Sequence, residues 1–247
     1  MIDLEKIIKR YGVTDSEDKL EDTSLCKLFR KYGSDKSLPS DFKENKVEYT
    51  YKCKIKERCL HNYSHFYHHL FESIKKEKIV FFEMGIGSRK KEVPSNMTHM
   101  EYTEDLEIGS SLRAWSDYFE NAKIYGADID PSLVFEEKNM RIKTFYCDQN
   151  SREDFLKIAN QIGEPLDVII DDGRHTPEAN LNFFNASFDH LKSGGVYIIE
   201  DVMLTGERKK LHEENISHFE TRASFVELIE LDSSFNGKDN NLIVILK

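Results

Sequence analysis

The sequence predicts an α/β protein with a doubly wound sheet of seven strands, the last of them antiparallel, and a small helical lobe at the N-terminus. From residue 78 onward, short apolar runs alternate with amphipathic segments of helical spacing, which is typical of parallel βα units. Two of the apolar runs end in adjacent carboxylates, Asp171-Asp172 and Glu200-Asp201. An Asn-Gly turn between the last two runs favours a closing antiparallel pair.

The N-terminal residues 1–75 are predicted to form the helical lobe. They are rich in Lys, Glu, Tyr and His and contain few β-branched runs. Helical spacing of apolar residues occurs at 3–11, 20–32 and 63–75. Gly33 ends the second of these segments, and Pro39 prevents it from resuming.

The main domain is predicted to span residues 76–247. Its expected strands are 78–83, 123–128, 142–147, 166–171, 196–200, 225–231 and 242–246. Its expected helices are 112–119, 151–162, 177–191 and 207–219. Ser151 is a predicted N-cap, and Ser193-Gly-Gly195 is a predicted C-cap of the helix that starts at residue 177. The charged, irregular segment 89–108 is either a lid or a disordered loop; we favour a lid because it emerges beside a glycine turn.

Composition limits the classes of partner. The 247 residues carry a net charge of −10 with a pI of about 5.5, which argues against nucleic acid as a main partner. No run approaches the ~20 apolar residues needed to cross a bilayer, so we expect no membrane insertion. The four cysteines show no CxxC spacing, which favours free thiols in a reducing cytoplasm. A homo-oligomer is compatible with the sequence.

A glycine turn, Glu83-Met-Gly-Ile-Gly87, follows the first strand of the main domain. Such glycines let a ligand approach the backbone closely, and Asp128 at the end of the next strand is placed to accept hydrogen bonds from ribose hydroxyls. A carboxylate as near as Glu83 suits a cationic or zwitterionic cofactor better than a pyrophosphate. Asp148-Gln149 ends the third strand, where it either meets an adenine amino group or closes an Asx turn.

The paired carboxylates predict a metal site. The carboxyl ends of parallel strands meet at one edge of a sheet, which is where open α/β sheets bind ligands. Carboxylates crowded together repel one another unless a cation or proton intervenes, and oxygen ligands suit Mg²⁺. His175 follows Asp172 by three residues and is a candidate general base, because histidine changes protonation near neutral pH.

Together these residues resemble a class I S-adenosylmethionine-dependent methyltransferase, a Rossmann-like fold that the antiparallel finish also favours. More narrowly, the chain is similar to the metal-dependent sugar O-methyltransferases of the macrolide type, with cephalosporin hydroxylase-like relatives. The matching motifs are Lys31-Tyr-Gly-Ser-Asp-Lys36, Glu83-Met-Gly-Ile-Gly87, Gly109-Ser-Ser-Leu-Arg-Ala-Trp115, Ile124-Tyr-Gly-Ala-Asp-Ile129, Cys147-Asp-Gln149, Asp171-Asp-Gly-Arg-His175 and Glu200-Asp201. The segment 89–108 is longer than the family pattern, and the macrolide enzymes carry a larger N-terminal region.

The resemblance implies a role for each matching residue. Asp172, Glu200 and Asp201 would hold Mg²⁺ or a similar divalent cation, and His175 would be the general base. The implied lining of the S-adenosylmethionine pocket is Glu83, Gly85, Gly87, Ser111, Asp128, Asp148 and Gln149, with Asp171 at the same strand end.

The function expected from these features is transfer of a methyl group to a sugar hydroxyl. The acceptor is expected to be a small-molecule sugar or sugar nucleotide, and our preferred acceptor is a hexose or heptose that is nucleotide-activated or belongs to a surface glycan such as a capsular polysaccharide. A catechol or small-phenol O-methyltransferase is an alternative, since metal anchoring also suits vicinal phenols. A non-catalytic S-adenosylmethionine-binding module is a second alternative from another class. A nicotinamide-dependent oxidoreductase would call for a third glycine and a parallel last strand.

Several other polar side chains are expected to have ordinary roles. The histidines 61, 65, 68 and 69 are predicted to lie on the lobe surface, with Tyr63 and Tyr67 bordering the active site. Lys36 and Arg113 are predicted to be surface charges, although either could meet an acceptor phosphate. Trp115 is predicted to pack in the core.

Overall fold

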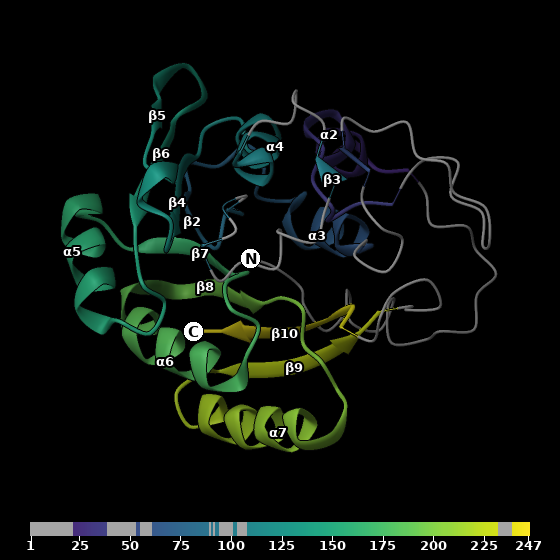
Figure 1. The fold of residues 1–247 in the computed structure, drawn as a ribbon, viewed down its shortest axis with the longest axis vertical. Helices are drawn as coiled ribbons and strands as arrows, with labels where there is room; N and C mark the ends of the chain where they lie inside the picture. Colours follow the sequence, from purple (N-terminus) through teal and green to yellow (C-terminus); the bar gives the residue numbers. More distant parts are fainter. Residues whose placement is uncertain are drawn as a thin grey trace.

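The computed structural model describes residues 22–38, 53–54, 61–88, 90, 92–93, 101–102, 108–231 and 239–247. Its centre is an eight-stranded sheet in the order β5-β6-β4-β2-β7-β8-β10-β9 (Figure 1). The strands are β2 (Val80–Met84), β4 (Lys123–Asp128), β5 (Glu136–Glu137), β6 (Ile142–Tyr146), β7 (Leu166–Asp171), β8 (Leu191–Ile199), β9 (Phe225–Glu230) and β10 (Asn241–Leu246). The predicted helix 3–11 and most of the predicted lid 89–108 lie outside the described residues.

The topology confirms the predicted sheet. Strands β6, β4, β2, β7 and β8 are parallel neighbours, and β10 lies between β8 and β9, antiparallel to both. These seven strands are the predicted ones, and the two-residue edge strand β5 is an addition. The registers pair Met84 with Asp171 and Asp171 with Ile199. The ends of β2, β7 and β8 therefore lie level, which brings their terminal carboxylates to one edge.

Helices cover both faces of the sheet (Figure 1). One face carries α2 (Ser24–Tyr32), α3 (Tyr63–Phe71) and α4 (Ser110–Tyr118), and the other carries α5 (Arg152–Ile162), α6 (Pro177–Ser187) and α7 (Gly206–Glu220). A separate two-stranded pair joins β1 (Cys53–Lys54) to β3 (Glu101–Tyr102). The described residues also contain the short 3₁₀ turns η3 (Pro131–Leu133), η4 (Lys138–Met140) and η5 (Phe188–His190).

Alternate residues of each strand feed two cores, as expected for a sheet that is buried on both faces. Phe81 points into the core under α2, α3 and α4, and its neighbour Phe82 points into the core under α5 and α6. Trp115 is fully buried, as predicted, and contacts Phe29 and Tyr67 edge-on with ring centroids 5.0 and 5.3 Å apart. Helices α2 and α3 therefore share one core with the sheet; the division into 1–75 and 76–247 stays a prediction.

Local signals explain where most elements begin and end. The Ser151 hydroxyl accepts from the Asp154 backbone N–H, as predicted for the N-cap of α5, and Thr176 caps α6 in the same way ahead of Pro177. The predicted helix 177–191 was too long. It ends at Ser187, and Ser193-Gly-Gly195 lies inside β8 instead of forming a C-cap. The reason is that β8 already begins at Leu191, which pairs with Leu166 of β7. After this pair the register shifts at a bulge. There the backbone of Lys247 accepts from the Gly194 N–H and donates to the Gly195 carbonyl.

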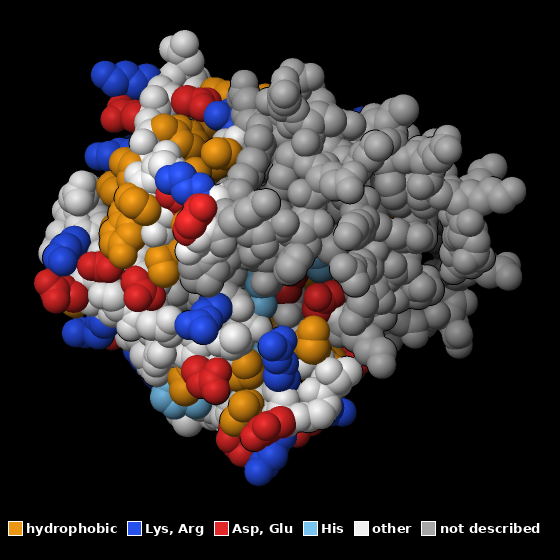
Figure 2. Space-filling view, viewed as in Figure 1, with side chains coloured by type: hydrophobic (Ala, Val, Ile, Leu, Met, Phe, Trp, Pro, Cys, Tyr) orange, Lys and Arg blue, Asp and Glu red, His pale blue; other side chains and the backbone are white. Residues whose placement is uncertain are grey.

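The surface of the described residues is mixed in character. Figure 2 shows hydrophobic side chains gathered at the β5–β6 edge, where Val134 and Tyr146 are the exposed large hydrophobics.

Cys26 and Cys147 are buried and free. Among the described residues, every helix is too short or too polar to cross a membrane.

One buried histidine predicts a pH dependence of stability. His212 of α7 is 2% exposed, and neither ring nitrogen has a hydrogen-bond partner among the described residues. Burial, helped by the charge of Arg208, lowers the pKa of His212 from 6.5 to about 4. Below pH 6.5 the unfolded chain therefore binds a proton that the folded chain does not, so stability falls as the pH drops from about 6.5 to about 4.

We predict that His212→Leu flattens this part of the pH–stability curve, because leucine suits the buried position and carries no titrating group. Urea unfolding between pH 4 and pH 7 measures the effect. The control is His218→Leu, which removes an exposed histidine of the same helix and should leave the slope in place. Equal slopes for His212→Leu and the unsubstituted protein would contradict the assignment.

Candidate active site at the carboxyl edge of the sheet

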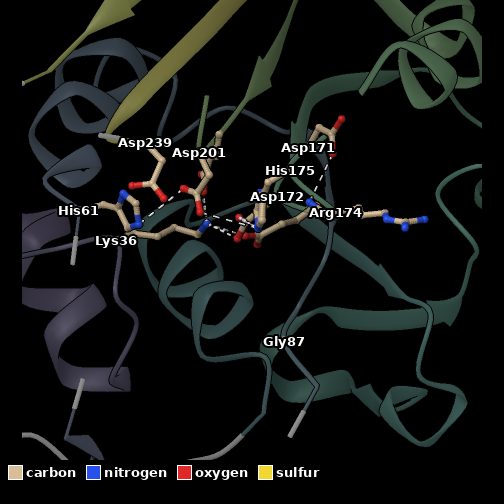
Figure 3. Close-up of polar contacts among 12 residues, drawn as sticks. Lys36, His61, Gly87, Asp171, Asp172, Arg174, His175, Asp201 and Asp239 are labelled. Carbon is tan, nitrogen blue, oxygen red and sulfur yellow. Dashed lines mark hydrogen bonds and ion pairs between the residues drawn. The ribbon is translucent and has the colours of Figure 1, made fainter. Parts of the chain in front are cut away.

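The edge formed by the ends of β2, β7 and β8 carries the predicted acidic residues. Glu83 and Glu200 are 0% and 1% exposed, while Asp172 and Asp201 are partly buried. Figure 3 shows Asp172, His175 and Asp201 turned toward one another, with Asp171 and Arg174 turned away. Burial raises the pKa of Asp172 and of Glu200 well above the ordinary value, because water no longer stabilises the charges. The cluster therefore needs a cation.

Lys36 supplies one such cation, contrary to the prediction that it is a surface charge. Its side chain is 3% exposed, and Nζ lies 2.6 Å from Asp172 Oδ2 and 3.4 Å from Glu83 Oε1. Nζ also donates to Glu200 Oε2. Burial alone would lower the pKa of Lys36, but the charges of Asp172, Glu200 and Glu83 outweigh it and raise that pKa well above its ordinary value. The ammonium group is therefore charged at any physiological pH.

Two tyrosines of α3 hold the carboxylates of β8, which confirms that they border the site. Tyr67 Oη donates to Glu200 Oε1 at 2.5 Å. Tyr63 Oη donates to Asp201 Oδ1 at 2.8 Å and lies 3.2 Å from the Asp201 backbone N–H, from which it accepts. Glu200 is thus held by Tyr67 on one oxygen and by Lys36 on the other.

Asp172, His175 and Asp201 form the group with metal-binding geometry. One ligand atom from each lies within 4.8 Å of the others, all three residues being half-buried. His175 Nε2 is 3.9 Å from Asp172 Oδ1 and 3.7 Å from Asp201 Oδ2. His175 and Asp201 both have left-handed backbones, with φ of 54° and 56°. Such conformations cost about 1–2 kcal/mol in non-glycine residues, and strain of this kind gathers at functional sites.

His61 and Asp239 also lie next to Asp201, and the sequence did not predict a role at this site for either residue. His61 is 5% exposed, and its Nε2 lies 3.6 Å from Asp201 Oδ1 (Figure 3). Burial alone would raise the pKa of Asp201, but its neighbours His61, His175 and Lys36 and the hydrogen bond from Tyr63 outweigh burial and lower that pKa. Asp239, from the segment before β10, faces the same group, and burial next to Asp201 raises its pKa. The predicted surface position was wrong for His61 and also for His65, which is 7% exposed.

The glycine turn has the shape of a ligand cradle. Gly85 and Gly87 have φ of 87° and 85°. A Cβ on Gly85 would lie 2.0 Å from the Asp172 carbonyl oxygen, so only glycine fits there. Asp128 Oδ2 accepts from the backbone N–H groups of Ile86 and Gly87, and this fixes the turn. Asp128 keeps further lone pairs for a ligand.

Glu83 presents a buried carboxylate beside this turn. Its Oε2 accepts from Ser111 Oγ at 2.9 Å, so the predicted residue Ser111 orients Glu83 from the start of α4. Its Oε1 makes no hydrogen bond among the described residues and forms an ion pair with Lys36 Nζ at 3.4 Å. Such a buried carboxylate oxygen gains stability from a further donor. The acceptor oxygens of Glu83 therefore fit the amino group of S-adenosylmethionine.

The remaining predicted cofactor-binding residues form hydrogen bonds with other residues of the protein. Asp148 Oδ1 accepts from the Asn150 backbone N–H, which makes the Asx turn. Gln149 donates to Asp171 Oδ1 at 2.6 Å and accepts from the Arg174 backbone N–H at 2.7 Å. Asp171 also accepts from Asn180, and burial raises its pKa to about 6. Gln149 and Asp171 thus shape the loop that carries Asp172 and His175.

The residues present also fit a divalent cation. Asp172 and Asp201 offer the oxygen ligands that Mg²⁺ prefers, and one carboxylate oxygen of each lies within 4.8 Å of the other, close enough to share one ion beside His175. Glu200 lies at the same strand end, but its oxygens face Lys36 and Tyr67. Arg113, the other predicted surface charge, pairs with Glu137 away from this edge and is 8% exposed.

Comparison with known proteins confirms the sequence resemblance. The chain is 36% identical over 144 residues to mycinamicin VI 2''-O-methyltransferase of Micromonospora griseorubida, which covers 58% of this chain and 32% of that protein. It is 35% identical over 143 residues to demethylmacrocin O-methyltransferase of Streptomyces fradiae, with the same coverage. It is 30% identical to a rhamnosyl tetracenomycin-C 2'-O-methyltransferase of Streptomyces olivaceus. The matched part is about a third of the length of each relative. No family model matches the chain.

Solved structures confirm the Rossmann-like methyltransferase fold. A MycE methyltransferase from the mycinamycin pathway, in complex with Mg and SAH, superposes with a TM-score of 0.59 at 23% identity. The match covers 91% of this chain and 55% of that one. A second MycE structure, with Mg, SAH and mycinamycin VI, gives a TM-score of 0.60 at 20% identity. The sheet order and the antiparallel finish seen here are thus those of a known methyltransferase fold.

The hydrogen bond from Tyr67 generates a prediction about stability. Tyr67→Phe would leave Glu200 Oε1 buried without its donor, so we expect a loss of about 1–3 kcal/mol in the free energy of unfolding. Urea titration measures it. The control is Tyr118→Phe, whose hydroxyl bonds to the backbone carbonyl and the ring Nδ1 of His68 instead of to a buried carboxylate, and which should cost less. An equal loss in the two variants would contradict the view that Glu200 depends on Tyr67.

Proposed function

We propose that the protein is an S-adenosylmethionine-dependent O-methyltransferase that uses a divalent cation, best Mg²⁺, and methylates a hydroxyl of a sugar. The observation that carries this proposal is the juxtaposition at one sheet edge of a glycine turn, with the buried carboxylate of Glu83 beside it, and the group Asp172, His175 and Asp201. A methyl donor and a metal-anchored acceptor need such neighbouring sites. The similar named proteins support the same reaction class.

The cofactor would lie against the turn at the end of β2. Glu83 would accept from its amino group, Gly85 and Gly87 would allow its close approach, and Asp128 would accept from ribose hydroxyls. Ser111 would keep Glu83 oriented. Direct contact by Asp148, Gln149 or Asp171 stays a prediction.

Asp172 and Asp201 would hold the divalent cation. That Glu200 is a third ligand of this cation stays a prediction. When bound, S-adenosylmethionine supplies the electrophilic methyl group, and the cation supplies charge that lowers the pKa of a hydroxyl beside it. The chain's residues fix the acceptor next to the donor, which removes much of the entropy cost of bringing the two together.

His175 would take the proton of the acceptor hydroxyl at Nε2. This nitrogen faces Asp172 and Asp201, so it lies beside the position where the hydroxyl would be anchored. Asp201 sits between the imidazoles of His61 and His175, which holds the His175 ring toward the site. General-base catalysis of this kind contributes ~10²–10⁴-fold to the rate.

The identity of the sugar is the finer part of the proposal. The relatives are named for mycinamicin VI, demethylmacrocin and a rhamnosyl tetracenomycin, which supports a sugar hydroxyl in a small glycoside. A nucleotide-activated or surface-glycan hexose or heptose remains our preferred acceptor on composition alone, since the Lys- and Asn-rich chain suggests an AT-rich genome. We expect the enzyme to act in the cytoplasm.

A mass-spectrometric assay tests the proposal. With S-adenosylmethionine and Mg²⁺, one member of a panel of glycosides, sugar nucleotides and catechols should gain one methyl group. His175→Ala should lower turnover by ~10²–10⁴-fold and leave S-adenosylhomocysteine affinity unchanged, while Asp172→Asn should abolish the response to Mg²⁺. His218→Ala, an exposed histidine on α7, serves as the control.

Three outcomes would count against parts of this assignment. Absence of S-adenosylhomocysteine binding would remove the methyltransferase proposal altogether. Near-normal turnover by His175→Ala would remove the base, and activity that survives chelation would remove the metal. Methylation of catechols alone would replace the sugar with the phenol alternative.

A further inference from the structure

Lys36 stands between the two halves of the proposed site. Its Nζ contacts Glu83, at the cofactor turn, and also Asp172 and Glu200, at the metal edge. These three carboxylates end three adjacent strands, β2, β7 and β8. The lysine itself comes from the segment after α2, where the Lys36 carbonyl accepts from the Ser64 backbone N–H at the start of α3. The charge is thus held in place by backbone and side chain together.

The charge balance shows what Lys36 does. Glu83, Asp172, Glu200 and Asp201 bring up to four negative charges to one buried edge, and the closest fixed positive charge to three of them is Lys36. Removing one partner of a buried ion cluster leaves charges that nothing compensates, and such groups separate or take up protons. Glu83 would then lose the ion pair at Oε1 and keep only the hydrogen bond from Ser111 at Oε2, so it would no longer hold a defined position beside the cofactor turn.

We propose that Lys36 is a positioning residue. Its charge holds Glu83 in place, so that the cofactor pocket is formed even when no divalent cation is bound. This inference rests on the proposed function and goes beyond it. The lysine ammonium group already supplies positive charge to Glu83 and to the two carboxylates beside it, so metal and cofactor bind almost independently. Without Lys36, the divalent cation becomes the main source of positive charge at the edge, and cofactor affinity becomes dependent on the metal.

Calorimetric titration of S-adenosylhomocysteine, with EDTA and with Mg²⁺, tests the proposal. The quantity of interest is the ratio of the two dissociation constants. We expect a ratio within about twofold for the unsubstituted protein and for Lys36→Arg, which keeps the charge. For Lys36→Met, Mg²⁺ should tighten binding at least tenfold, which equals about 1.4 kcal/mol. Lys192→Met is the control, because Lys192 is an exposed lysine that pairs with Asp167 at the opposite end of β7.

The ratio separates positioning from a general structural role. If Lys36→Met weakens binding equally with and without Mg²⁺, the lysine is merely structural and the proposal is overturned. Strong metal dependence in the unsubstituted protein also overturns it, and this measurement decides the matter even if Lys36→Met fails to fold. Absence of binding by the unsubstituted protein in both buffers removes the proposed function itself, an outcome distinct from either ratio.

Discussion

The ion cluster around Lys36 is the interaction on which the arrangement of this site depends. A parallel sheet places the ends of β2, β7 and β8 level with one another, and each of these strands ends in or next to a carboxylate. Without a cation the three charges would repel at short range in a region shielded from water. The ammonium group of Lys36 offsets part of this repulsion and opposes the rise that burial causes in the pKa of all three carboxyls, and so helps to make a dense acidic edge compatible with a stable fold.

The N-terminal helices are built into this arrangement. Their aromatic residues share the core that contains Trp115, while Tyr63 and Tyr67 of α3 hold Asp201 and Glu200. Residues before the first strand of the sheet therefore supply polar contacts to the site. Below the edge, Gln149, Asp171 and Asn180 tie together the loop that presents Asp172 and His175. The left-handed backbone at His175 and Asp201 is held by these surrounding contacts.

The sequence predicted well what local patterns determine. Apolar runs with terminal acids located β2, β4, β7 and β8, and the Asn-Gly dipeptide, which lies outside the described residues, predicted the pairing of β9 with β10. Lys36, His61 and Asp239 escaped prediction because their roles arise from packing between segments that are far apart in the sequence. A lysine in a polar segment is normally solvated, and no local pattern marks the rare one that is buried. The glycines after α6 were misassigned because a strand bulge and a helix C-cap use the same residues.

The most direct test of a shared cofactor and metal edge is a crystal structure with S-adenosylhomocysteine and Mn²⁺, located by its anomalous scattering. We expect one anomalous peak in contact with the carboxylates of Asp172 and Asp201, the cofactor amino group on Glu83, and Lys36 still paired with Glu83 and Glu200. A peak elsewhere, or a Lys36 side chain displaced from the cluster by the metal, would contradict this account.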